Sequence, residues 1–136
     1  MASLADRTSR ELAELGHCQV AGLLDAFGRL VRACLARPDS DPVFCGLLDG
    51  RVGAAERAGF ATELMGIAAQ GQRYRQNTAV VETVPSDAAI NPLRLTDFCP
   101  RFRERGRVFK PMTFIRIVEP QPGRTRVRLR FKRVNY

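Results

Sequence analysis

The sequence predicts an α+β protein, with N-terminal amphipathic helices packed on a C-terminal antiparallel sheet of three or four strands. In the first part of the chain, apolar residues recur every three or four positions, the spacing of an amphipathic helix. Beyond Gly71 the chain becomes rich in proline and β-branched residues, which favour strands and turns. Between Arg124 and Tyr136 cations alternate with apolar residues, which is the period of a strand.

The helical prediction covers residues 1–71. Gly16, Gly22 and Gly28 weaken a first helix, which must end before Pro38. A second helix is expected from about Ala54 to Gln70, with Gly71 as its stop. The stripe of the first helix consists of Leu12, Leu15, Val20, Leu23, Leu24, Phe27, Leu30, Val31 and Cys34.

The strand prediction covers residues 72–136. Thr78–Val84 and Met112–Glu119 are rich in β-branched and apolar residues and predict two strands. A Pro- and Gly-containing turn follows the second of these, so residues 124–136 are expected to return as the other arm of a hairpin. On this return strand Val127, Leu129 and Phe131 are expected to seal a core, while the cations between them face solvent.

The length and composition fit one intracellular domain. A chain of 136 residues can bury a working core, and 45% hydrophobic with 26% charged residues is typical of a soluble protein. No apolar run approaches the roughly 18 residues of a membrane span, and the N-terminus does not resemble a signal peptide. We therefore expect a single cytoplasmic domain, with a helical half at about 1–71 and a basic, β-rich half at about 72–136.

The charge is divided unevenly between these halves. Residues 1–70 hold seven cations and nine acids, whereas residues 71–136 hold fifteen cations and five acids. The second half is therefore strongly basic, which favours a polyanionic partner. All but two of the cations are Arg, which suits phosphate recognition, although a GC-rich genome produces the same preference.

The candidate site is a basic surface with interleaved aromatic residues. Cations beside Phe102, Phe109 and Tyr74 are typical of proteins that bind RNA or single-stranded DNA, because bases stack on rings while phosphates pair with cations. The predicted nucleic-acid-binding residues are Arg73, Arg75, Arg101, Arg103, Arg105, Arg107, Lys110, Arg126, Arg128, Arg130 and Lys132. The alternatives are a solvated strand face that only prevents aggregation, and a protein-interaction module that docks an acidic partner or forms a homodimer.

Catalysis, metal binding and a cofactor are not expected. His17 is the only histidine, and no P-loop, GxGxxG or GxSxG pattern occurs. Cys18, Cys34, Cys45 and Cys99 lack zinc-site spacing, so we expect reduced, buried thiols.

One short segment resembles a known family. Within Val84–Pro100, residues Pro85, Ser86, Ala88, Ile90 and Pro92 match the Pro-Ser-x-Ala-x-Ile-Asp-Pro segment that opens a group of bacterial PAS-like sensory domains, and Pro100 matches the proline of the Leu-Leu-Pro that follows it in that group. Asn91 stands where that group usually has Asp. The resemblance implies a ligand-sensing or dimerisation role and transfers no ligand-contacting residue.

Overall fold

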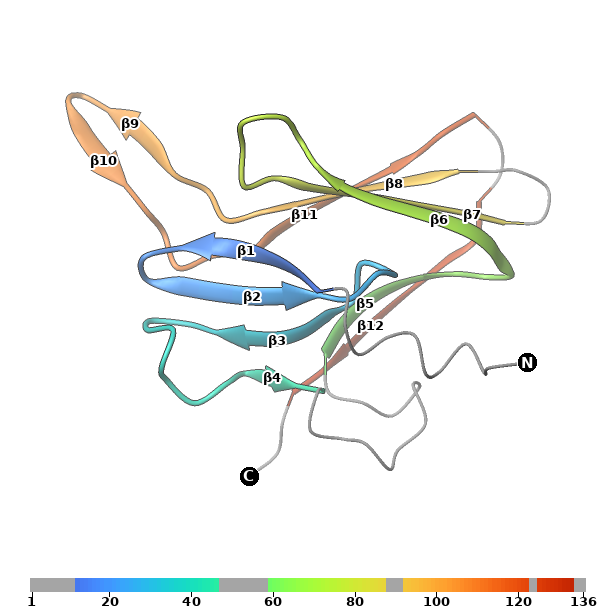
Figure 1. The fold of residues 1–136 in the computed structure, drawn as a ribbon, viewed down its shortest axis with the longest axis horizontal. Coiled ribbons are helices and arrows are strands. Elements are labelled where there is room, and N and C mark those ends of the chain that lie inside the picture. The colour runs from blue at the N-terminus through green and yellow to red at the C-terminus, as the bar shows by residue number, and fades with distance from the viewer. Residues whose placement is uncertain (1–11, 47–58, 88–91, 123–124, 134–136) are drawn as a thin grey trace.

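A computed structural model describes residues 12–46, 59–87, 92–122 and 125–133 of the chain, and these residues form strands and turns without any helix (Figure 1). The α+β prediction is therefore wrong, since the described part is an all-β protein of antiparallel sheets. These residues also include no helix long and apolar enough to cross a membrane. The strands are β1 (Ala13–His17), β2 (Val20–Leu24), β3 (Leu30–Cys34), β4 (Phe44–Cys45), β5 (Gly59–Leu64), β6 (Ile67–Tyr74), β7 (Val81–Asp87), β8 (Leu93–Phe98), β9 (Phe102–Glu104), β10 (Arg107–Phe109), β11 (Ile115–Pro120) and β12 (Val127–Lys132).

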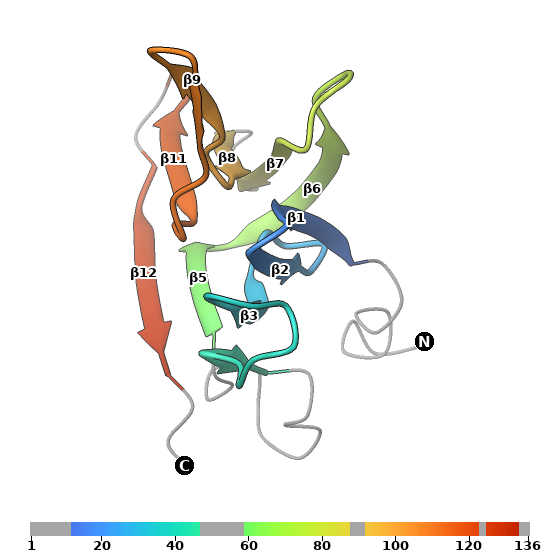
Figure 2. The same cartoon turned by 90° about the vertical axis from the view of Figure 1, so that its left-hand side faces the viewer.

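The strands form three sheets. The first sheet has the order β1-β2-β3-β5-β12, with β4 also paired to β3. The second sheet has the order β11-β8-β7-β6, and β9 pairs with β10 in a separate two-stranded ribbon. The chain passes from the first sheet to the second between β5 and β6, and back again between β11 and β12 (Figures 1 and 2).

The N-terminal apolar spacing comes from short strands rather than from a helix. Within β1 and β2 buried residues alternate with period two, and each turn resets the phase, so Leu15 and Val20 belong to different strands. Gly22 is required in β2 because a Cβ atom there would lie 2.7 Å from a ring carbon of Phe114. The second predicted helix is replaced by β5 and β6, and its first residues, 54–58, lie outside the described part.

The predicted C-terminal hairpin is also wrong, although both of its strands exist. β11 pairs with β8, in the register Arg116↔Asp97, and β12 pairs with β5, in the register Leu129↔Thr62. The turn-like segment between β11 and β12 therefore connects two sheets instead of closing a hairpin. The strand expected at Thr78–Val84 is confirmed as β7, shifted by a few residues toward the C-terminus.

The core combines apolar side chains with one buried ion pair. Its apolar part includes Leu15, Leu24, Leu30, Phe44 and Val81, all at most 5% exposed. Between the sheets, the guanidinium of Arg116 donates to Asp97, with Nε–Oδ1 at 2.7 Å and Nη2–Oδ2 at 3.1 Å. Both side chains are almost completely buried, so this pair is part of the core.

Arg116 also reaches across to the first sheet. Its Nη1 donates to Thr62 Oγ1 on β5 at 3.3 Å, and its Nη2 donates to the carbonyl oxygen of Gly28 in the turn between β2 and β3. The guanidinium carbon lies 4.9 Å from the centre of the Phe60 ring. One side chain therefore ties β11 to β8 within the second sheet, and ties that sheet to the first.

Replacing Arg116 with Ala is expected to lower the free energy of unfolding by about 3–5 kcal/mol, because Asp97 would remain buried without its counter-ion. Urea unfolding followed by circular dichroism measures this loss. The double variant Arg116→Met/Asp97→Leu should lose less than Arg116→Ala, since it removes both charges at similar volume. A double variant as unstable as the single one would show that burial of the pair is not what makes Arg116 necessary.

Candidate nucleic-acid interface

β9 and β10 form a ribbon that we call the arm, defined as residues 101–110. It lies at the end of the molecule opposite the C-terminal end of β12 (Figures 1 and 2). Residues 101–109 are all exposed, and Lys110 is half-buried at the foot of the arm. The arm carries five cations and one acid, and is therefore the most basic short segment that projects from the sheets.

The arm turns sharply at Arg105 and Gly106. Both residues have positive φ, 48° and 75°, as a two-residue type I′ hairpin turn requires. Glu104 pairs with Arg107 across this turn. The sequence contains a signal for this hairpin, because the Arg-Gly dipeptide lies between two short runs that include apolar residues. The signal is weak because Arg at the first turn position is less typical than Asn or Asp.

The two faces of the arm differ in chemistry. Phe102 and Phe109 are cross-strand partners, and their rings stack with centroids 5.4 Å apart and planes inclined by 15°. Since alternate residues point to opposite faces, Glu104 and Arg107 share the face of the two rings, whereas Arg103 lies on the other face with Val108. A hollow of about 500 Å³ lies against the arm, lined by Glu104, Arg105, Arg107 and Phe109. One face of the arm thus combines the stacked rings with Arg107 and Glu104, and the other face carries Arg103.

The foot of the arm is held by the turn between β1 and β2. Nε2 of His17 lies 3.0 Å from the carbonyl oxygen of Pro111, to which it donates. The backbone N–H of Gln19 donates to Nδ1 of the same ring at 3.2 Å. The only histidine of the chain therefore has both ring nitrogens engaged in positioning the start of the segment that leads into β11.

Arg73 and Arg75, predicted as part of the same site, surround a carboxylate. Arg73 Nη2 lies 3.0 Å and Arg75 Nη2 lies 3.2 Å from oxygens of Glu82, whose side chain is 6% exposed. The hydrogen bond from Arg73, followed by the charges of Arg73, Arg75 and Arg94, lowers the pKa of Glu82 below its ordinary value. Part of the positive charge predicted here is therefore compensated within the protein.

The predicted cations of β12 do not join the arm. β12 lies at the edge of the first sheet and runs away from the arm toward the C-terminus (Figure 2). Arg126, Arg128 and Lys132 are exposed, whereas Arg130 forms an ion pair with Glu63 on β5 and thereby lowers the pKa of that carboxyl. The structure therefore separates the predicted site into two basic regions, one on the arm and one on β12.

The expectation that Val127, Leu129 and Phe131 seal a core is wrong. They share a face with core residues of β5, but β12 is the outermost strand, where that face is no longer covered. Val127, Leu129 and Phe131 are 39%, 64% and 64% exposed.

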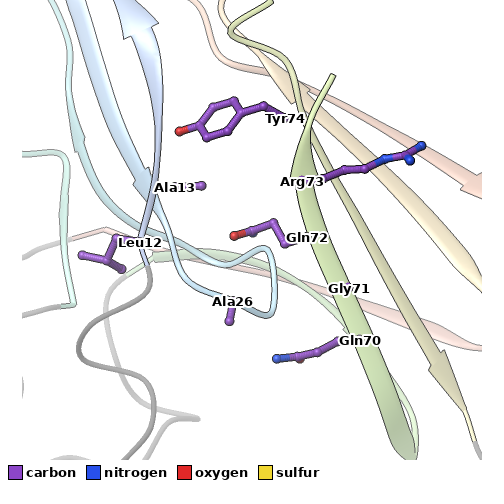
Figure 3. Close-up of a pocket in the computed structure, with 8 residues that line it drawn as sticks. All are labelled: Leu12, Ala13, Ala26, Gln70, Gly71, Gln72, Arg73 and Tyr74. Carbon is purple, nitrogen blue, oxygen red and sulfur yellow. The ribbon is translucent and has the colours of Figure 1, made fainter. Parts of the chain in front are cut away.

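A pocket of about 330 Å³ lies between the edges of the two sheets, lined by Leu12, Ala13 and Ala26 on one side and by residues 70–74 of β6 on the other (Figure 3). The Tyr74 hydroxyl crosses this gap, accepting from the Glu14 N–H and donating to the Glu14 carbonyl. The Gln72 amide nitrogen donates to the Asp25 carbonyl and to Thr83, and Arg73 points away from the pocket. None of the eight lining residues carries a carboxylate, imidazole or thiol. The polar groups of the pocket mainly form hydrogen bonds that connect the two sheets.

We expected four buried thiols, but only one of the four cysteines is fully buried. Cys18 is exposed, Cys34 is buried, and Cys45 and Cys99 are intermediate. Within the described residues, no three His, Cys, Asp or Glu side chains are placed to hold a metal ion. Burial, together with the charge of Asp97, raises the pKa of the Cys99 thiol to about 12.

Comparison of the chain with family models, curated proteins and solved structures found no match. The resemblance to PAS-like domains is therefore unsupported by these comparisons. In the structure its described residues include the end of β7 and the whole of β8.

The stability difference between the wild type and Glu82→Gln is expected to depend on pH. Because the folded-state pKa of Glu82 lies below the ordinary value of 4.5, its stabilisation is present above pH 4.5 and is lost as pH falls through the folded pKa. Urea unfolding of both proteins between about pH 7 and pH 3 measures the difference. Glu119→Gln, on an exposed position of β11, is the control. A difference that does not change with pH would contradict the assignment.

Alkylation of the unmodified protein with iodoacetamide at about pH 8 should modify Cys18 first and Cys99 much later, because the exposed thiol is accessible and the Cys99 thiolate is suppressed. Mass spectrometry of proteolytic peptides gives the order. Equal rates in the folded protein would contradict the burial of Cys99.

Proposed function

We propose that this protein binds RNA or single-stranded DNA, as a binding module rather than an enzyme, and that the arm is its main contact. One observation carries the proposal: a stacked Phe pair stands among exposed arginines on a ribbon whose residues 101–109 are all exposed. The comparisons contribute nothing to it, so the support is physical.

Both faces suit an unpaired polynucleotide. Bases stack on exposed aromatic rings with about 1–3 kcal/mol per base, whatever the base, because every base has a π-face. Phe102 and Phe109 are 48% and 41% exposed, so one side of the stacked pair is open to a base. Guanidinium groups pair with phosphate through two parallel hydrogen bonds. Arg103, Arg105 and Arg107 provide such groups at the far end of the arm.

Other predicted cations have a smaller part in the proposal. The loop between β6 and β7, next to Arg75, lies at the same end of the molecule as the arm (Figures 1 and 2). Arg73 and Arg75 are therefore placed to extend a path from the arm, with their charge reduced by Glu82. β12 lies at the other end, and we leave it out of this interface.

Removing charge from the arm should reduce both affinity and its salt dependence. For Arg103→Gln/Arg105→Asn/Arg107→Gln, the slope of log K against log salt should fall in magnitude by about 2, at about 0.7 per phosphate contact. Fluorescence anisotropy with labelled single-stranded RNA and DNA measures the slope. Asn keeps the positive φ of the turn accessible.

The matched control for this triple variant is Arg126→Gln/Arg128→Gln/Lys132→Gln, which removes the same charge from β12. A control that weakens binding as much as the arm variant would place the contact elsewhere. No binding by the wild type at low salt would overturn the proposal.

Removing the aromatic face should weaken binding without changing the salt slope. Phe102→Leu/Phe109→Leu is expected to lose about 1–3 kcal/mol, or about 5–150-fold in affinity, whereas Phe102→Tyr/Phe109→Tyr should stay close to the wild type. The same anisotropy titrations at fixed salt give both values. Equal losses in the Leu and Tyr variants would indicate that the rings only shape the arm.

A further inference from the structure

The edge of the first sheet at β12 carries an apolar row that the described residues of the chain leave exposed. Val127, Leu129 and Phe131 oppose Leu64, Thr62 and Phe60 of β5 and therefore share their face of the sheet. On β5 this face is covered, since Leu64 and Thr62 are each 5% exposed, whereas Leu129 and Phe131 are each 64% exposed. Phe131 touches Phe44 with its edge, at a centroid distance of 5.1 Å, and leaves most of its surface in solvent.

The backbone of the same strand is also available. Among the described strands, β12 pairs only with β5, so it forms an edge of the sheet (Figure 2). The carbonyl of Arg126 accepts from the N–H of Met65, and therefore points toward β5. Because backbone groups alternate sides along an antiparallel strand, the N–H and C=O groups of Val127, Leu129 and Phe131 point away from β5. An exposed edge of this kind is a template for another strand.

The opposite face of the strand presents positive charge. Arg126 and Arg128 are exposed there, and Arg128 lies across from Glu63 in the strand register. An added strand would therefore have one face against apolar side chains and the other beside cations.

A second copy of this strand does not meet these conditions. In antiparallel pairing of β12 with itself, a register that matches the apolar faces sets Arg and Lys opposite Arg and Lys, which is destabilising. A shift by one residue removes this repulsion but places cations on the apolar face. The partner that fits this edge is therefore a different chain.

We propose that the β12 edge binds an extended segment of a protein partner in which apolar and acidic residues alternate. Its backbone continues the ladder of the first sheet, its apolar residues cover Leu129 and Phe131, and its carboxylates lie beside Arg126 and Arg128. This mode of recognition is strand addition, in which backbone hydrogen bonds give affinity and alternate side chains give specificity. The site is separate from the arm and does not depend on what the arm binds.

The probe is a fluorescent peptide in which Glu and Val alternate over the length of β12, compared with a peptide of the same composition that has Glu and Val in two blocks. Anisotropy should show binding of the alternating peptide at least about tenfold tighter than of the block peptide. Amide hydrogen exchange of Val127, Leu129 and Phe131 should slow when the alternating peptide is added. Equal binding of both peptides would overturn the proposal, since charge alone would then explain it.

One pair of variants tests the contribution of the backbone, and one charge-reversed double variant tests the contribution of the cations. Leu129→Pro and Leu129→Ala both remove the exposed side chain, but only Pro removes an N–H that points away from β5. The Pro variant should bind about tenfold more weakly than the Ala variant. The variant Arg126→Glu/Arg128→Glu should no longer bind the acidic peptide and should instead bind a peptide in which Lys and Val alternate.

Thermal melting and circular dichroism verify that these variants are folded. Equal affinities of the Pro and Ala variants, or failure of the charge-reversed variant to gain the basic peptide, would contradict strand addition. Displacement of the bound peptide by an oligonucleotide, with loss of oligonucleotide binding in Arg126→Glu/Arg128→Glu, would assign β12 to nucleic acid instead.

Discussion

The buried pair of Arg116 and Asp97 is the interaction on which the arrangement of the two sheets depends. Burial raises the pKa of Asp97, and the hydrogen bond and charge of Arg116 act against that shift. Such a pair contributes little net stability compared with an apolar pair of the same volume, but it permits few alternative arrangements. Here its donors also engage Thr62 and the Gly28 carbonyl, so a displaced strand or sheet would leave buried charge unpaired.

This constraint accounts for the position of β12. Arg116 opposes Asp97 in the register of β11 on β8, which commits β11 to the second sheet. The chain then crosses over, and β12 adds to β5 at the edge of the first sheet. That edge extends past the core, and the apolar side of β12 stays exposed as a consequence. The uncovered row thus follows from the geometry that buries Arg116.

The sequence indicated the strand character of the C-terminal half but not its pairing. Alternation is a local property, and it correctly predicted strands at β11 and β12. Pairing depends on long-range contacts such as Arg116–Asp97, which no local pattern reveals, so the nearest strand was wrongly chosen as the partner. In the N-terminal half, short strands and tight turns produced the apolar spacing of a helix. The turn Asp25–Arg29 contained a signal against the helix, because Asp and Gly at these positions favour a turn. In the structure the Asp25 carboxylate accepts from two backbone N–H groups there, and Gly28 has a positive φ of 72°.

The sequence suggested individual site residues, and the structure shows that they do not form one surface. A continuous basic face was expected because all its cations lie in one half of the sequence. The fold instead places the arm and β12 at opposite ends, and it pairs Arg73 and Arg75 with Glu82. The two basic regions also differ in what accompanies the charge. On the arm it is a pair of stacked rings, which suits bases. On β12 the charge is accompanied by an exposed apolar row and by backbone groups that point outward. A polynucleotide can neutralise the cations there but cannot continue the sheet. We therefore propose different partners for the same residue type in the two places, because stacked rings accompany the cations on the arm and outward-pointing backbone groups accompany them on β12.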